Sequence, residues 1–117
     1  MNKRSFGKKN EDLAVDFLQK KGYTILQRNF YTRYGEIDIV ALRDDTVVFI
    51  EVRSLSKTNF GLPQESLNKT KIKKIIKTAE YFLYKNNLTD KNIRFDVVAI
   101  FQESITHIEN AFNLDFL

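Results

Sequence analysis

With 117 residues, the chain is long enough for one domain, residues 1–117, whose hydrophobic core needs no disulfide or structural metal. It contains no cysteine, which excludes disulfide frameworks, cysteine-based zinc sites and cysteine nucleophiles, and is compatible with a reducing, cytoplasmic location. Its formal net charge of +4 at pH 7 favours nucleic acid as a partner, ahead of an anionic membrane surface, and we find no signal peptide or membrane-spanning stretch.

The first two predicted elements are a helix and a strand. Apolar residues recur at helical spacing over about Phe6–Lys21, and Gly22 stands where a C-terminal cap is expected. Glu11 lies on this helix, where an acid on the outer face needs no special role. The segment Tyr23–Phe30 carries β-branched and aromatic residues, which is typical of a strand.

Basic and aromatic side chains alternate in the next segment, RNFYTRY, residues 28–34. Such interleaving can hold phosphates with arginines, here Arg28 and Arg33, and can stack bases on aromatic rings. The same pattern also suits a core phenylalanine followed by ordinary edge tyrosines. Both interpretations stay open.

The segment GEIDIVALRDDTVVFIEVR, residues 35–53, predicts two antiparallel strands that turn at Asp44-Asp45. If the turn has two residues, one face of the hairpin is wholly apolar. It is formed by the pairs Ile37–Val52, Ile39–Ile50 and Ala41–Val48. On the other face, Asp38 falls opposite Glu51 and Glu36 falls opposite Arg53.

Two acids at opposed positions destabilise a sheet, because their Cβ atoms lie only about 4.5 to 5.5 Å apart. Three devices can relieve the repulsion between Asp38 and Glu51. These are a lysine or arginine from elsewhere, a raised carboxyl pKa, and a divalent metal ion. Oxygen ligands at this spacing suit Mg²⁺ or Mn²⁺.

A polar loop at 54–62 follows the hairpin and contains Lys57, which can line a site beside the acids. Pro63 precedes the next helix, which runs from about Glu65 or Ser66 to Lys85. Lysines recur at every fourth position of this helix, at Lys69, Lys73 and Lys77. Such a stripe is usually a solvated face, but these lysines become phosphate contacts if the helix borders the acids.

The last part of the chain predicts two more strands. The near-continuous hydrophobic run Arg94–Phe101 favours an interior position in the sheet. Asp96 within it pairs with Arg94 or supports the site, and we favour the structural role. A short final strand is expected at Ile105–Ile108. Three apolar residues then attach the tail to the core: Phe112, Leu114 and Phe116.

The order of these elements predicts an α/β fold with a mixed central β-sheet flanked by helices. Six motifs are spread along the chain: GxxNEDLA at 7–14, GYTILQRN at 22–29, GEID at 35–38, FIEVR at 49–53, FGLP at 60–63 and RFDVVAI at 94–100. Together they resemble the YraN-like family of small bacterial endonuclease-like proteins. That family is similar to archaeal Holliday-junction resolvases and to PD-(D/E)XK nucleases, so the resemblance implies a restriction-endonuclease-like core.

The resemblance also implies a metal-dependent active site. Asp38 and Glu51 would be the carboxylates that bind Mg²⁺ or Mn²⁺. Glu11 would be a further acid that reaches the site from the first helix, and the carbonyl of Val52 would be an additional metal ligand. Such a site would carry out metal-assisted hydrolysis of a phosphodiester bond.

Arg53 stands where the nuclease motif has lysine. It keeps the positive charge, but it cannot give up a proton and tends to fork onto a carboxylate such as Glu36. Lys57 or Lys69 would then have to supply the missing ammonium group.

Three hypotheses follow. The first is a metal-dependent endonuclease that acts on DNA, with branched or structured DNA as the implied substrate. Cutting a junction would call for a homodimer, although no stretch of the sequence marks an interface. The alternative is a nucleic-acid-binding module on a nuclease fold that has lost catalysis. The third is a small interaction protein in which the charged residues form only an ion-pair cluster.

Overall fold

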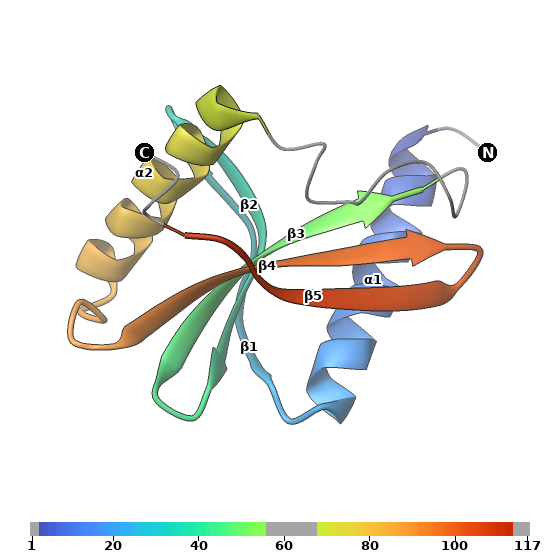
Figure 1. Ribbon diagram of the computed structural model, residues 1–117, viewed down its shortest axis with the longest axis horizontal. Helices are drawn as coiled ribbons and strands as arrows, with labels where there is room; N and C mark the ends of the chain where they lie inside the picture. The colour runs from blue at the N-terminus through green and yellow to red at the C-terminus, as the bar shows by residue number, and fades with distance from the viewer. Residues whose placement is uncertain (1–2, 56–67, 114–117) are drawn as a thin grey trace.

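Five strands form one mixed sheet in the order β1-β2-β3-β4-β5 (Figure 1). The computed structural model describes residues 3–55 and 68–113. Strands β3 and β4 are parallel, whereas the other neighbours are antiparallel. The elements are α1 (Lys3–Lys20), β1 (Thr24–Thr32), β2 (Gly35–Arg43), β3 (Thr46–Ser54), α2 (Lys69–Lys85), β4 (Asn92–Phe101) and β5 (Ser104–Phe112). The predicted α/β fold with a mixed sheet and flanking helices is confirmed.

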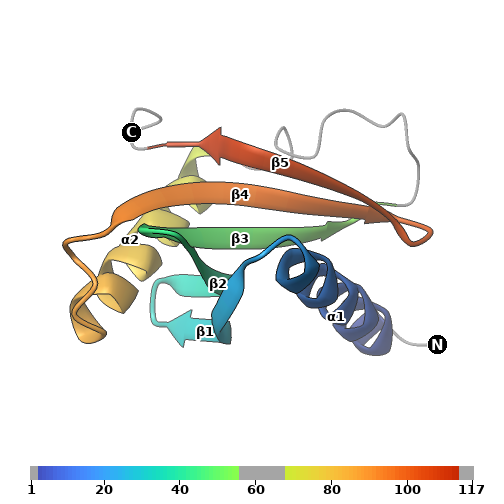
Figure 2. The same cartoon turned by 90° about the horizontal axis from the view of Figure 1, so that it is seen from below.

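The two helices pack on opposite faces of the twisted sheet (Figure 2). Successive side chains of a strand point to opposite faces, so β2 and β3 contribute to both cores. The α1 face buries Ala14 and Leu18 against Ile39, Ala41, Val48 and Ile50. The α2 face buries Ile72, Ile76 and Phe82 against Val40, Val47 and Phe49. Among the residues described, neither helix combines the length and the apolar run needed to cross a bilayer.

Local sequence signals explain where both helices begin or end. After α1, Gly22 has a φ of +96°, and the amides of Gly22 and Tyr23 donate to carbonyls in the last turn, as the predicted glycine cap requires. Helix α2 begins at Lys69, later than expected, because Asn68 is its N-cap and accepts a 2.8 Å hydrogen bond from the amide of Lys71. The predictions for Lys57, Pro63, Glu65 and Ser66 lie outside the described residues.

The two-residue turn at Asp44-Asp45 is confirmed. Arg43 pairs with Thr46, and the register continues as predicted to Ile39 opposite Ile50. Asp44 has a φ of +53°, in the left-handed region that such hairpin turns require and that aspartate tolerates.

The ladder ends at Ile39–Ile50, so three predicted pairs beyond it are wrong. They are Asp38–Glu51, Ile37–Val52 and Glu36–Arg53. Ile37 packs on the α2 face with Val40, although Ile39 lies on the α1 face, so the alternation of β2 breaks at Asp38. Across from this point on β1, Asn29 has a φ of +52°. The carboxylate of Asp38 accepts a hydrogen bond from the Val52 amide, which the ladder leaves free.

Strand β4 lies between β3 and β5, which confirms its predicted interior position. Strand β5 is longer than the expected Ile105–Ile108 and brings Phe112 onto Phe95, with ring centroids 4.9 Å apart. Phe112 is therefore part of the core, as predicted. Leu114 and Phe116 lie outside the described residues.

Candidate functional site

Two acids converge where strands β2 and β3 separate. Asp38 Oδ2 accepts a 2.8 Å hydrogen bond from the amide of Val52, which fixes the carboxylate between the strands. Glu51 follows Phe49 on the α2 face of β3 and is only 6% exposed. The pair predicted from the hairpin sequence is thus brought together, although by a break in the ladder and not by a cross-strand pair.

Burial raises the pKa of both carboxyl groups. For Glu51, burial and then the charge of Asp38 raise the pKa to about 8. For Asp38, burial raises the pKa to about 6, although the hydrogen bond from Val52 acts in the opposite direction. A raised pKa is one of the three predicted ways to relieve the repulsion between the two acids. A cation bound nearby would lower both pKa values again.

Three buried polar atoms at this site have no hydrogen-bond partner among the described residues: Glu51 Oε1, Arg53 Nε and Arg53 Nη2. Buried polar atoms in folded proteins are nearly always paired, because an unpaired one costs roughly 1 to 3 kcal/mol. The expected fork of Arg53 onto Glu36 is wrong for this part of the chain, because the two form no ion pair. One acceptor and two donors therefore remain for a ligand.

The donor set fits a hard divalent cation. The described residues contain no group of three or more acidic, histidine or cysteine side chains arranged to hold a metal. Mg²⁺, however, commonly binds one or two carboxylates and completes its shell with water and substrate phosphate. Asp38 and Glu51 would supply those carboxylates, and the unpaired Oε1 of Glu51 is a free ligand atom. The amide of Val52 donates a hydrogen bond to Asp38. The carbonyl of Val52 stays a predicted ligand of the metal ion.

Glu11 lies on α1 close enough for its charge to act on Asp38, and its role as a further acid of the site stays a prediction. Its charge contributes to the raised pKa of Asp38. Its Oε1 atom also accepts hydrogen bonds from Arg28 Nε and Asn29 Nδ2, both at 3.0 Å. Arg28 additionally donates to Asp12, so the guanidinium predicted to contact phosphate is already shared by two carboxylates.

The lysine whose charge acts on Glu51 is Lys71, which is not among the three predicted lysines; it lowers the pKa of that acid. Lys71 and Lys74 line a cleft of about 360 Å³ beside Glu36, at the start of α2. Lys69 and Lys73 are exposed on other parts of the helix surface. The sequence contains a signal that these two lysines lie near the sheet, because Lys71 and Lys74 directly precede the buried residues Ile72 and Ile75.

Lys77 and Arg33 both lie over the ring of Tyr34. Lys77 Nζ and the guanidinium carbon of Arg33 each lie 5.1 Å from the ring centroid of Tyr34. Arg33 Nη2 also donates to the Tyr34 hydroxyl at 3.0 Å. These two predicted phosphate contacts therefore lie at the β1–β2 turn. Lys57, the remaining one, is outside the described residues.

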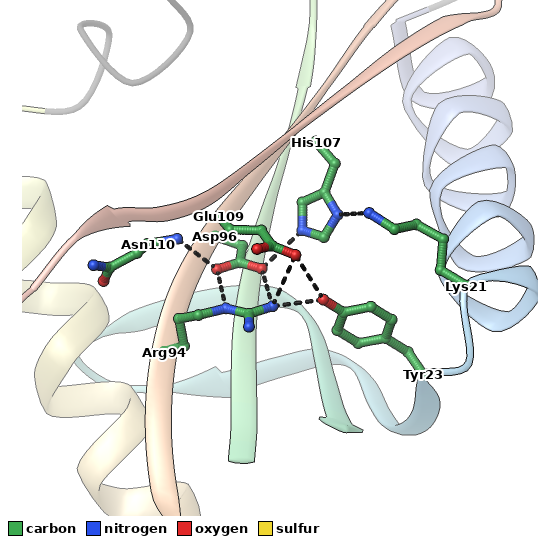
Figure 3. A network of polar contacts seen from close by, with 7 residues as sticks. All are labelled: Lys21, Tyr23, Arg94, Asp96, His107, Glu109 and Asn110. Carbon is green, nitrogen blue, oxygen red and sulfur yellow. Dashed lines mark hydrogen bonds and ion pairs between the residues drawn. The ribbon is translucent and has the colours of Figure 1, made fainter. Parts of the chain in front are cut away.

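Asp96 belongs to a separate network on the α1 face (Figure 3). The carboxylate of Asp96 is fully buried, and Arg94 donates hydrogen bonds to both of its oxygens, at 2.9 and 2.8 Å. His107 Nε2 lies 2.7 Å from Oδ2, and the amide of Asn110 donates to Oδ1. Lys21 lies 2.8 Å from the other ring nitrogen of His107. The expected pairing of Asp96 with Arg94 is confirmed, and the network ties β4 to β5 and α1.

The sequence model described as "Uncharacterised protein family UPF0102" matches residues 10–100. A UPF0102 protein of Persephonella marina is 49% identical over 110 residues, covering 94% of this chain and 95% of its own. One of Clostridioides difficile is 45% identical over 114 residues, covering 96% and 100%. The chain belongs to the UPF0102 family, the YraN-like family that the motifs resemble.

Proposed function

We propose that this protein is a metal-dependent endonuclease that hydrolyses DNA at the carboxylate pair of Asp38 and Glu51. The observation that carries the proposal is the buried Glu51 beside the half-buried Asp38, both with raised pKa, next to unpaired donor atoms of Arg53. Strongly perturbed acids cluster at functional sites, which favours a chemical role for this pair. An antiparallel three-strand unit followed by a helix and a parallel strand also suits the restriction-endonuclease-like core that the motifs imply.

Each residue has a definite task in this proposal. Asp38, held by the Val52 amide, and Glu51 would bind Mg²⁺ or Mn²⁺. The bound metal would polarise the phosphate and lower the pKa of an attacking water. The charge of Arg53, whose buried Nε and Nη2 atoms are unpaired among the described residues, would stabilise the transition state.

Arg53 cannot act as a base, because its guanidinium does not give up a proton near neutral pH. Lys71, whose charge lowers the pKa of Glu51, would supply the ammonium group that the motif lysine would otherwise provide. If Lys71 does not serve in this way, the protein is a DNA-binding module without hydrolytic activity. Arg53 is the specific observation that favours this second function.

Cleavage assays with Mn²⁺ on duplex, flap and four-way-junction DNA test the proposal. We expect the wild-type protein to cut at least one of these substrates and Asp38→Asn and Glu51→Gln to lose the activity. The matched controls are Asp90→Asn and Glu80→Gln, which change exposed acids away from the site and should cut normally.

Activity that survives in both site variants would disprove the assignment of the acids. A wild-type protein that binds DNA but cuts none of the substrates would favour the binding module. Comparing the wild-type protein with Arg53→Lys then isolates the motif position, because a gain of cleavage would identify Arg53 as the limiting residue.

A further inference from the structure

Exposed tyrosines gather around a hollow between the edge strand β1 and helix α2. Tyr31 is 67% exposed and Tyr81 is 49% exposed, which is unusual for large aromatic side chains. The hollow has a volume of about 520 Å³ and is lined by Tyr31, Thr32, Arg33, Tyr34 and Tyr81. Its wall thus consists mainly of aromatic rings and one arginine.

Contacts with the core and between β1 and α2 hold the lining of the hollow in place. The ring of Tyr81 stacks on the buried Phe30, with centroids 6.2 Å apart and planes 26° from parallel. The hydroxyls of Thr32 and Thr78 lie 3.2 Å apart and connect β1 to α2. The tyrosines are therefore presented on ordered elements, which lowers the entropy lost when a flat ligand binds.

The charges at the hollow are cationic where a phosphate would lie. Arg33 and Lys77 both approach the ring of Tyr34, and neither forms an ion pair within the described part of the chain. The acids lie on the Tyr31 side of the hollow, where Glu36 has the largest effect in raising the pKa of Tyr31. Ring faces beside unpaired cations match a base and its phosphate better than they match an apolar protein surface.

The hollow also leads to the acid pair. Tyr31 is the cross-strand partner of Glu36, and the charges of Glu11 and Asp38 add to the raised pKa of its hydroxyl. On the other side of the turn, Gly35 lines the cleft that contains Lys71, while Tyr34 lines the hollow. A bound strand could therefore pass from the tyrosines to the carboxylates over one turn.

We infer that this hollow binds unpaired nucleotides of DNA, with Tyr31 and Tyr81 stacking on bases and with Arg33 and Lys77 contacting phosphates. The inference rests on the proposed nuclease function and names its substrate class, DNA with a single-stranded segment beside the cleaved bond. Bases inside a duplex present no free face to these rings, so the hollow selects unpaired over paired DNA.

Fluorescence anisotropy in EDTA, where no metal-dependent cleavage occurs, tests the inference with a labelled single strand and a blunt duplex of equal length. We expect the double variant Tyr31→Ala/Tyr81→Ala to bind the single strand roughly tenfold more weakly and the duplex nearly unchanged. The variant Tyr31→Phe/Tyr81→Phe keeps both rings and should bind like the wild type. Tyr84→Ala is the matched control, because Tyr84 is 78% exposed on the same helix but does not line the hollow.

Wild-type affinity of the alanine double variant for the single strand would overturn the inference, while the cleavage assay would still decide the proposed function. Failure of the wild-type protein to bind the single strand would overturn the inference as well, and the cleavage assay with Mn²⁺ would again decide the proposed function separately. An equal loss for single strand and duplex would also contradict stacking, and thermal unfolding of each variant verifies that it is folded. Replacing Arg33 and Lys77 by glutamine should weaken binding and make it less sensitive to salt.

Discussion

At the scale of single residues, Glu51 occupies a position where an apolar side chain would stabilise the sheet better. Its carboxyl group is buried beside Asp38, and one of its oxygens has no described partner. Burying such a group costs free energy unless it is paired, and proteins keep these costs mainly at functional sites. A bound cation would remove the cost, which gives the acid pair a purpose that packing does not.

The pH dependence of stability should reveal this cost. The pKa of Glu51 in the folded protein, about 8, is above its ordinary value of 4.5, so the folded state holds the proton more tightly. Stability in EDTA should therefore fall as the pH rises from about 4.5 to about 8. At pH 9, Glu51→Gln should be more stable than the wild type by up to about 5 kcal/mol, the shift from 4.5 to about 8 at about 1.4 kcal/mol per pKa unit.

Urea unfolding at pH 5.5 and pH 9 measures this difference. At the lower pH the wild-type carboxyl is mostly protonated, so the advantage of Glu51→Gln should largely disappear. Glu80→Gln, an exposed change on α2, should show no such dependence on pH. A stability difference between Glu51→Gln and the wild type that is the same at both pH values would contradict the raised pKa.

At the scale of elements, the sequence predicted the strands and the hairpin register well because these depend on local patterns. The turn at Asp44-Asp45 and the alternation of side chains along β3 depend only on residues that are adjacent in the sequence. The break at Asp38 was not predictable in this way, since it coincides with features of two other strands, the positive φ of Asn29 in β1 and the hydrogen bond from the Val52 amide in β3. The predicted start of α2, Glu65 or Ser66, is too early because Asn68 caps the helix.

The site was predicted in the same uneven manner. Asp38 and Glu51 are neighbours for a reason close to the one expected, since both lie near the end of one hairpin. Which lysine approaches them depends on how α2 is rotated against the sheet, and this rotation follows from the packing of its buried face, which includes Ile72, Ile76 and Phe82. Spacing within α2 alone does not reveal these tertiary contacts, so the sequence does not single out Lys71.

A substitution in the Asp96 network should lower stability without changing cleavage. Burial alone would raise the pKa of Asp96, but hydrogen bonds from His107, Arg94 and the Asn110 amide lower it overall. Asp96→Asn removes a charge that faces Arg94, and loss of one partner of such a buried pair costs about 3 to 5 kcal/mol. We expect a much lower Tm and, below that temperature, cleavage like that of the wild type.

The acid limb of unfolding provides the companion measurement. Because the folded pKa of Asp96 is below its ordinary value of 3.8, its contribution to stability is present above that pH and is lost as the pH falls further. Asp96→Asn should therefore lack part of the acid-induced loss seen in the wild type. An unchanged Tm, or lost cleavage in a folded Asp96→Asn protein, would contradict a purely structural network.

At the scale of the whole molecule, the fold gathers the acid pair, the Lys71 cleft and the tyrosine hollow around one turn. The β1–β2 turn packs on α2, since a Cβ at Gly35 would lie 3.7 Å from atoms of both Lys74 and Thr78. Acids at the centre and cations around them suit a polyanion that is held by the cations and cleaved at a metal. This arrangement also fits the formal net charge of +4 of the chain.

Thermal unfolding with and without Mn²⁺ at pH 8 tests most directly whether Asp38 and Glu51 form a metal site. A ligand that binds only the folded state stabilises it by about 2.7 kcal/mol at 100 times its Kd, so the Tm of the wild-type protein and of Glu80→Gln should rise. In Asp38→Asn and Glu51→Gln the rise should be absent or much smaller. No rise in the wild type, or an equal rise in all four proteins, would contradict the metal site.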